Sequence, residues 1–289
     1  MRLADRLAER GVTLRHDHIG TQRLPCPECN RGLCDTALAI TIEHDGGAVW
    51  VCHRCGFKGA VRNRGESVTR PTESPQTKRS QPEHYTTLTP RWRDFWRDCR
   101  RITSGTVAAQ YLRSRGCGLP PVDGDLRWHS ECWHWPTQTR RPAMVGLITD
   151  AVTRAPLSLH FTFLRPDGTG KAGTERDKLL LPKHRKAGGV IRLWPDDVVT
   201  YSIGLAEGIE SALSLAHSHR PVWCTVDAGN LAKLPVLHGI ETVLVAVDSD
   251  RAGLKATRAF GETWSKAGKD VRLVIPERVG EDLNDVARA

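Results

Sequence analysis

The chain has 289 residues, which exceeds the usual size of one domain, so we expect two or three domains. It contains no apolar run of about 18 residues and no basic segment followed by an apolar leader. These features argue against a membrane-spanning helix and an export signal. We therefore expect a soluble, cytoplasmic protein with no membrane partner.

The net charge of +9 is unevenly distributed along the chain. Residues 202–289 hold 10 Lys and Arg against 12 Asp and Glu, a net charge of −2, whereas residues 1–201 hold 32 against 21, a net charge of +11. A basic segment followed by an acidic segment that can bind cations suits a polyanionic ligand such as nucleic acid. A solvated basic surface without a ligand would have the same composition.

Four of the nine cysteines form two C-x-x-C pairs near the amino terminus, Cys26 with Cys29 and Cys52 with Cys55. The pairs are separated by 22 residues that contain strand-like stretches at 37–42 and 48–51. Two such knuckles hold one tetrahedral Zn²⁺ through four thiolates, and a hairpin between them brings them together. The sequence therefore predicts a zinc ribbon with one structural zinc ion over residues 1–60.

Other potential ligands lie between or beside these pairs, namely Cys34, His44 and His53. None has the knuckle spacing, so we leave them out of the predicted zinc site. The metal can serve folding alone, because zinc supplies folding energy to a module too small for a sizeable core.

Residues 61–90 are rich in Ser, Thr, Pro and charged residues and lack apolar periodicity. This composition is typical of a flexible linker. We expect it to join the zinc-binding part to the rest of the chain, either as a simple tether or as a hinge.

Residues 91–201 combine helical and strand-like patterns. Helical patterns occupy residues 92–99 and 106–115, and the candidate strands are 144–149, 156–164, 178–182 and 190–193. Three tryptophans, Trp128, Trp133 and Trp135, lie close together before the first of these strands. Buried core positions are favoured for them over stacking on DNA.

An unbroken apolar run at residues 243–247 predicts a strand that is buried on both faces. Asp248 and Asp250 follow it directly. Two carboxylates at the carboxyl end of a parallel strand can turn toward one divalent cation. The same spacing also occurs in a turn that caps the next helix.

Two further acidic segments have a similar setting. Glu207 follows a short predicted strand and precedes Gly208, which we expect to allow a tight turn into a helix. Asp282 opens a short final helix after a predicted strand at residues 271–275. With a further strand at residues 222–226, this order predicts an α/β unit with acidic groups from three loops.

The segments AEGIESAL, VAVDSDRAG and EDLNDVA resemble the acidic motifs of the Toprim domain, which occurs in bacterial-type primases, topoisomerases and some nucleases. The resemblance covers residues 202–289 and implies a Rossmann-like fold. It implies that Glu207 is the lone acidic residue, that Asp248 and Asp250 are the metal-binding pair, and that Asp282 is a later ligand. Many primases have a lysine before this last residue, whereas this chain has Glu281.

A zinc ribbon ahead of a Toprim domain resembles the DNA primases of bacteria, phages and mobile elements. The resemblance implies an α/β fold with an α+β core, in which residues 91–201 form the amino-terminal part of the catalytic core. It also implies contacts with template DNA and nucleotides. The basic residues that we assign to these contacts are Arg54, Lys58, Lys178, Lys183, Arg192 and Arg251.

The expected activity is nucleotidyl transfer that makes short primers on single-stranded DNA from nucleoside triphosphates. Mg²⁺ or Mn²⁺ would be held by Asp248, Asp250 and Asp282, while Glu207 shares the metal or acts as general base. The alternatives are a Toprim-type nuclease and a non-catalytic DNA-binding mediator. Because the sequence contains no P-loop motif, we expect a separate replicative helicase or initiator protein as partner.

Overall fold

The computed structural model describes residues 3–29, 35–44, 46–61 and 85–288. The chain divides into two compact units, residues 1–79 and 80–289. Most of the predicted linker, residues 62–84, lies outside the described residues. Its end differs from the prediction, because Leu88 is buried and its backbone N–H donates to Pro156 O at 2.7 Å. Residues 85–90 therefore belong to the second unit.

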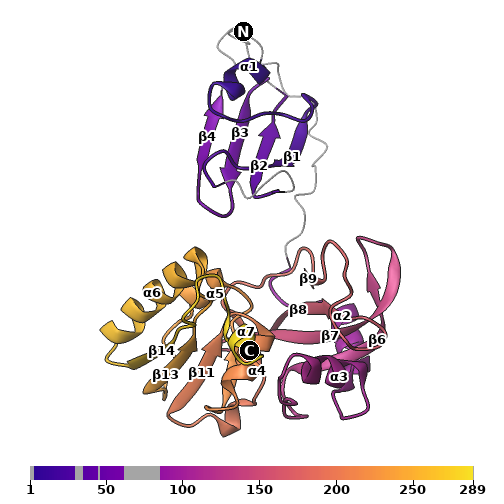
Figure 1. Ribbon diagram of the computed structural model, residues 1–289, viewed down its shortest axis with the longest axis vertical. Coiled ribbons are helices and arrows are strands. Elements are labelled where there is room, and N and C mark those ends of the chain that lie inside the picture. Colours follow the sequence, from indigo (N-terminus) through magenta and orange to yellow (C-terminus); the bar gives the residue numbers. More distant parts are fainter. Residues whose placement is uncertain (1–2, 30–34, 45, 62–84, 289) are drawn as a thin grey trace. The chain divides into compact units, whose positions relative to one another are not determined.

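The described residues of the first unit form a four-stranded antiparallel sheet with one short helix (Figure 1). Its elements are α1 (Leu3–Ala8), β1 (Gly20–Leu24), β2 (Leu38–Ile42), β3 (Ala48–Cys52) and β4 (Lys58–Val61). The strands follow one another in space as they do in sequence. The sequence predicted β2 and β3 but missed the two outer strands. The core includes Trp50, whose ring lies where a Cβ on Gly59 would come within 2.2 Å, so only glycine fits at that position.

The second unit contains one mixed sheet of ten strands. In its first half the elements are α2 (Pro90–Asp98), β5 (Arg100–Arg101), α3 (Val107–Ser114), β6 (Leu126–His134), β7 (Thr139–Asp150), β8 (Pro156–Phe163), β9 (Lys178–Leu180), β10 (Gly189–Arg192) and a 3-10 turn (Asp196–Val198). These strands pair in antiparallel fashion. The sequence predicted α2, α3 and β7 to β10 but missed β6, which contains Trp128 and Trp133.

The second half of this unit begins with four parallel strands and their helices. The elements are β11 (Ser202–Ala206), α4 (Ile209–Leu215), β12 (Val222–Cys224), α5 (Ala228–Ala232), β13 (Thr242–Ala246), α6 (Arg251–Lys266), β14 (Asp270–Val274) and α7 (Leu283–Val286). Strand β12 also pairs with β10, which joins the two halves into one sheet. The predicted α/β fold is thereby confirmed.

Hydrophobic cores cover both faces of the parallel strands. On one face, α4 packs with α3, and Ile209 and Leu213 lie in the same cluster as Leu112. On the other face, Phe260 and Trp264 of α6 pack with residues of α5. Helix α3 belongs to the first half of the second unit and α4 to its second half. The two halves therefore share the core on this face of the sheet.

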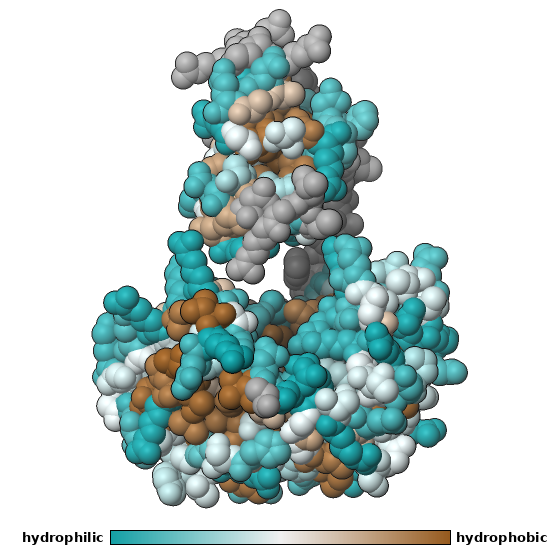
Figure 2. Space-filling model, in the orientation of Figure 1, coloured by the Kyte–Doolittle hydropathy of each residue, from teal (hydrophilic) through white to brown (hydrophobic). Residues whose placement is uncertain are grey.

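The outer edge of the sheet is formed by β14. Figure 2 shows apolar side chains in brown over β13 and β14. Leu273 of β14 and Ile275, which follows the strand, are 46% and 50% exposed. Among the described residues, no helix is long and apolar enough to cross a membrane.

Candidate active site and zinc centre

The four predicted zinc ligands lie together in the first unit. Cys26 Sγ is 3.6 Å from Cys55 Sγ, and Cys29 Sγ is 3.6 Å from Cys52 Sγ. All four sulfur atoms lie within 4.8 Å of one another. A tetrahedral zinc ion with bonds of about 2.3 Å places its sulfur ligands about 3.8 Å apart, so the observed spacing fits zinc.

The chemistry of these thiols also fits a bound cation. Burial and the neighbouring thiols raise the pKa of Cys29 to about 12. Against the effect of burial, hydrogen bonds from the backbone N–H groups of Cys55 and Arg54 lower the pKa of Cys52 to about 7. Four thiolates at this spacing repel one another, so a metal ion is needed to keep all four deprotonated. Of the rival ligands, Cys34 lies outside the described residues.

Two predicted DNA contacts lie in this unit. Arg54 forms a bidentate ion pair with Asp35, with both N···O distances at 2.8 Å, and also donates to Cys29 O at 3.2 Å. This side chain therefore braces the second cysteine knuckle against the first. Lys58, in contrast, is exposed at the start of β4 opposite Val51.

The acidic residues of the second unit lie at one edge of the parallel sheet. Glu207 follows β11 and Asp248 follows β13, and these strands are neighbours whose last residues, Ala206 and Ala246, pair directly. The loop that carries Asp282 is tied to the same place, because Ser249 N donates to Glu281 O at 2.9 Å. The fold thus brings together the three acidic loops that the sequence predicted.

Asp250 and Asp282 each cap a helix. Asp250 Oδ1 accepts from the N–H groups of Ala252 and Gly253 at 2.9 and 2.8 Å, at the start of α6. Asp282 Oδ1 accepts from the two N–H groups at the start of α7 at 2.7 and 3.0 Å. Both caps use Oδ1 only, so a carboxylate can hold its helix and still offer Oδ2 to a cation.

The electrostatics of the other two carboxylates indicate a cation site. Burial and the nearby Asp248 and Asp250 raise the pKa of Glu207 to about 8, and burial with Asp282 and Asp250 raises the pKa of Asp248 to about 6. Within the described part of the chain, Glu207 Oε1 and Asp248 Oδ1 are buried without a hydrogen-bond partner. Buried carboxylate oxygens without donors fit a hard divalent cation.

The acidic side chains are not packed as tightly as the cysteines. Among the described residues, only the four cysteines form a group of three or more possible ligands whose atoms are all this close. Carboxylates that lack a counterion repel one another, which favours the wider spacing.

Two glycines beside the acidic loops have different roles. A Cβ on Gly253 would lie 2.3 Å from Asp248 O, so glycine is required for α6 to begin against the end of β13. Gly208 has φ −98° and ψ 153°, which any residue adopts, and its Cβ would meet nothing closer than 3.5 Å. The turn after Glu207 therefore does not depend on the conformational freedom of glycine.

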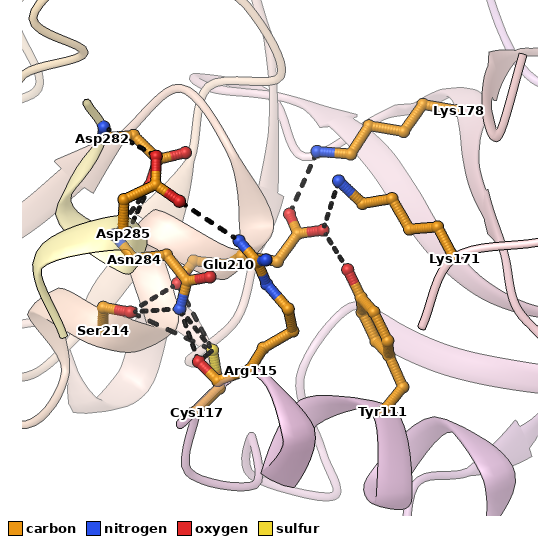
Figure 3. Close-up of polar contacts among 10 residues, drawn as sticks. All are labelled: Tyr111, Arg115, Cys117, Lys171, Lys178, Glu210, Ser214, Asp282, Asn284 and Asp285. Carbon is orange, nitrogen blue, oxygen red and sulfur yellow. Dashed lines mark hydrogen bonds and ion pairs between the residues drawn. The ribbon is translucent and has the colours of Figure 1, made fainter. Parts of the chain in front are cut away.

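Glu210 lies one helical turn beyond Glu207 and is buried at the meeting of the two halves of the unit (Figure 3). Its carboxylate accepts from Tyr111 Oη at 2.7 Å and from Lys178 Nζ at 3.1 Å, and Lys171 Nζ lies 3.6 Å away. Glu210 is therefore a buried, paired carboxylate and not a solvent-exposed one.

These contacts hold two ammonium groups at Glu210, one helical turn beyond Glu207. Burial opposes the charged form of Lys178, but the Glu210 carboxylate outweighs it and raises the pKa of Lys178. For Lys171, burial outweighs the same carboxylate and lowers the pKa. Lys178 also lies close enough to Asp248 to oppose the rise in the pKa of that carboxyl group. The predicted contact residue Lys178 therefore lies at the acidic site.

The sequence reasoning missed Asn284, which anchors the helix that Asp282 caps. Its Nδ2 donates to Arg115 O at 2.7 Å and to Ser214 Oγ at 2.9 Å (Figure 3). Asn284 is fully buried, and Asp285 beside it lies 3.8 Å from the guanidinium of Arg115. Because these partners are distant in sequence, no local pattern signals this role.

Three further basic residues were predicted to contact DNA or nucleotides, and they differ in their exposure to solvent. Arg192 is buried, where it pairs with Asp196 and donates to Thr149 Oγ1 and to two backbone carbonyls. Its donors are used inside the protein, so we correct its role to a structural one. Lys183 and Arg251 are exposed, and Arg251 is the first residue of α6.

Two regions of the chain match known families. Residues 86–193 match a family described as a domain of unknown function (DUF7146), and residues 202–289 match the Toprim domain family. No curated protein matches the chain.

Three similar solved structures come from primases. A DNA primase domain from Pseudomonas aeruginosa is 17% identical, with a TM-score of 0.46, over 69% of this chain and 74% of that chain. The primase fragment of the bacteriophage T7 primase-helicase protein is 14% identical, with a TM-score of 0.42, over 92% and 94%. The zinc-binding and RNA polymerase domains of the Aquifex aeolicus primase are 15% identical, with a TM-score of 0.46, over 100% and 80%.

The Toprim match covers the four parallel strands and all three acidic loops. The resemblance that the acidic motifs suggested is thereby confirmed, and the carboxyl-terminal part of the chain, residues 202–289, is a Toprim domain.

Proposed function

We propose that this protein is a DNA primase that synthesises short primers on single-stranded DNA by metal-dependent nucleotidyl transfer. The observation that carries the proposal is the pair of buried oxygens, Glu207 Oε1 and Asp248 Oδ1, which have no hydrogen-bond donor within the described residues of the Toprim domain. Lys178 is close enough to Asp248 to oppose the rise in the pKa of that carboxyl group, and an ammonium group there suits a triphosphate. We propose residues 91–201 as the amino-terminal part of this catalytic core.

Asp248, Asp250 and Asp282 would hold Mg²⁺ or Mn²⁺, because carboxylate oxygens are the ligands that these hard cations prefer. When bound, the cation supplies charge neutralisation for the triphosphate and for the attacking 3′-oxygen. The helix caps formed by Asp250 and Asp282 fix the direction of two of these ligands.

The protein side chains have distinct roles in the proposed reaction. Lys171 and Lys178 bind the triphosphate of the incoming nucleotide, held in place by Glu210. The 3′-oxygen of the primer attacks the α-phosphorus, the bond to the bridging oxygen breaks, and pyrophosphate leaves. Glu207, kept ionised by the bound cation, accepts the hydroxyl proton.

The first unit would act on the template. We propose that its four cysteines bind one zinc ion, which stabilises the sheet that presents Lys58 to DNA. Because a primase copies unpaired template, we propose a separate replicative helicase or initiator protein as its partner.

The experiment incubates zinc-loaded protein with single-stranded DNA of mixed sequence, labelled nucleotides, and Mg²⁺ or Mn²⁺. Asp250→Asn is the matched variant, because asparagine caps a helix as well as aspartate but lacks its charge. We expect short labelled products from the wild type and none from Asp250→Asn, which should melt at nearly the wild-type temperature. Asp250→Ala should lose the products and also about 1 kcal/mol of stability.

Other outcomes would overturn the proposal in different ways. Shortened template without new product would indicate a Toprim nuclease. Template that is bound but neither copied nor cut, with either metal and with helicase added, would indicate a DNA-binding mediator. Equal synthesis by wild type and Asp250→Asn would refute the metal assignment.

A further inference from the structure

A pocket of about 980 Å³ opens in the second unit, away from the acidic site. Phe161 of β8 lies in its wall, whereas the next residue, Thr162, pairs with Lys178 of β9. Successive residues of a strand point to opposite faces of the sheet. The pocket therefore lies on the face of β8 opposite to the one that carries the lysine pair.

Six aromatic residues line this pocket. They are Trp92, Phe95, His129, Trp133, Trp135 and Phe161. Phe161 lies at the centre, with ring centroids at 5.5 Å from Trp135, 6.1 Å from Phe95 and 6.2 Å from Trp92. Rings that pack on one another in this way form a fixed apolar surface.

One of these rings extends into solvent. Trp133 is 47% exposed, contrary to the prediction that the three tryptophans of this segment are buried in the core. It pairs across the β6–β7 hairpin with Arg140, which also lines the pocket. The register of the hairpin shifts between His129 and Cys132, and such bulges turn the side chains that follow. An exposed indole beside a guanidinium is suited to a planar ligand that carries negative charge.

The two segments that build most of the pocket are basic. Residues 90–101 hold five Arg against two Asp, and residues 126–141 hold three Arg against one Glu, a combined net charge of +5. The pocket lining itself contains Arg91 and Arg140 together with Asp94, Asp98 and Glu131. Asp94 is paired with Arg97, which offsets its charge. The surrounding charge therefore favours a polyanion.

We infer that this pocket binds bases of a single-stranded nucleic acid, with Trp133 as a stacking surface and Arg140 as a contact to phosphate. Every base has a flat face that stacks on an aromatic ring, so such a site tolerates many sequences. In a duplex these faces are already covered by neighbouring base pairs, so the pocket selects unpaired strands. The inference does not depend on catalysis at the Toprim domain.

The test measures binding of a labelled single-stranded oligonucleotide of mixed sequence, and of its duplex, to the full chain without nucleotides or added Mg²⁺. Trp133→Ala should weaken binding of the single strand by roughly 5- to 150-fold, because stacking on one ring contributes about 1–3 kcal/mol. Trp133→Phe should retain most of the affinity. Arg140→Ala should weaken binding and lower the slope of log affinity against log salt by about 0.7.

Tyr201→Ala is the matched control, because Tyr201 is 66% exposed and does not line this pocket. It should bind as the wild type does, and all variants should melt within a few degrees of the wild type. Photo-cross-linking of a thiothymidine oligonucleotide should modify the peptide that contains Trp133. Wild-type affinity in both Trp133→Ala and Arg140→Ala, or cross-links only in other peptides, would overturn the inference, as would equal binding of the duplex.

Discussion

Lys178 Nζ lies 3.1 Å from Glu210 Oε2, in an ion pair that joins residues 86–193 to the Toprim domain. Tyr111 and Lys171 reach the same carboxylate, so three side chains from the first region converge on one residue of the second (Figure 3). Each region thus supplies part of the proposed site. The lysines come from one region and the carboxylates from the other.

Glu210→Gln should therefore impair nucleotide binding and stability together. The amide keeps an acceptor for Tyr111 but no charge for the two lysines, which should cost about 1–3 kcal/mol of stability. We expect the KM for nucleotides to rise about tenfold with a smaller change in kcat, because the lysines lose their fixed positions. Glu262→Gln on the exposed face of α6 is the control, and should change neither quantity. Unchanged KM and stability in Glu210→Gln would refute the role.

The loss of stability in Glu210→Gln should also depend on pH. Although burial opposes it, the neighbouring lysines and the Tyr111 hydroxyl hold the pKa of Glu210 well below its usual value of 4.5. A lowered pKa in the folded state adds stability above pH 4.5 and loses it as the pH falls. Wild type and Glu210→Gln should therefore differ most near pH 6 and converge toward pH 2. Urea denaturation at several pH values would measure this, and a constant difference would contradict it.

Gly253→Ala should disrupt the acidic edge. Its Cβ would lie 2.3 Å from Asp248 O, which is backbone and cannot move aside cheaply. We expect a loss of at least 2 kcal/mol, as for other overpacked positions, and loss of synthesis, since α6 and Asp248 must separate. Gly261 is the matched control in the same helix, because a Cβ there meets nothing within 4 Å. Gly261→Ala should stabilise the protein by about 0.5–1 kcal/mol, and chemical denaturation would compare the two.

The raised pKa values of Glu207 and Asp248, about 8 and about 6, predict how pH and metal act on stability. An acid whose pKa is raised by folding binds more protons in the folded state, so stability falls as the pH rises. Without added Mg²⁺, the melting temperature should fall between pH 4.5 and pH 8 and then level off. Glu207→Gln should lose the part of this fall above pH 6.

Added Mg²⁺ should reverse that fall, because a bound cation favours the ionised carboxylates. The increase in melting temperature on adding Mg²⁺ should be larger at pH 8 than at pH 6 in the wild type, and smaller in Glu207→Gln. Differential scanning calorimetry at both pH values measures it. An equal response to Mg²⁺ at pH 6 and pH 8 would show that no carboxylate with a raised pKa lies at the metal site.

The parts of the structure that could be predicted from sequence are those encoded by local patterns. The spacing of Cys26 and Cys29 repeats in the second cysteine pair, and the structure brings all four sulfur atoms together. The apolar run before Asp248 predicts a buried parallel strand, and parallel strands place their following loops at one edge. In both cases, residues within a few positions of one another determine the geometry.

What could not be predicted depends on contacts between distant residues. Glu210 is buried because Tyr111, 99 positions earlier, and Lys178, 32 positions earlier, pack against it. Arg192 belongs to a basic stretch of the sequence, yet its partner Thr149 lies 43 positions away in the interior. Trp133 is a large aromatic residue of the kind that is usually buried, but it lies beyond a shift in strand register and is exposed. Such placements follow from tertiary packing and leave no local signal.

Disrupting the zinc centre should destabilise the first compact unit but not the second. Cys52→Ser should remove one of four ligands, reduce the zinc content from one per chain to nearly none, and unfold the first unit, because a structural zinc ion supplies much of the folding energy of so small a module. The second unit has its own cores and should melt as in the wild type. Metal analysis and calorimetry would measure both effects.

Cys132→Ala is the matched control for this prediction, because Cys132 is also buried but lies in the second unit. It should retain zinc and lower only the transition of the second unit. Because we propose that the first unit acts on the template, Cys52→Ser should also lose the preference for particular template positions at which synthesis starts. It should still extend a supplied primer. Loss of primer extension would instead show that the second unit needs the zinc centre to fold, and full zinc content in Cys52→Ser would refute the four-cysteine site.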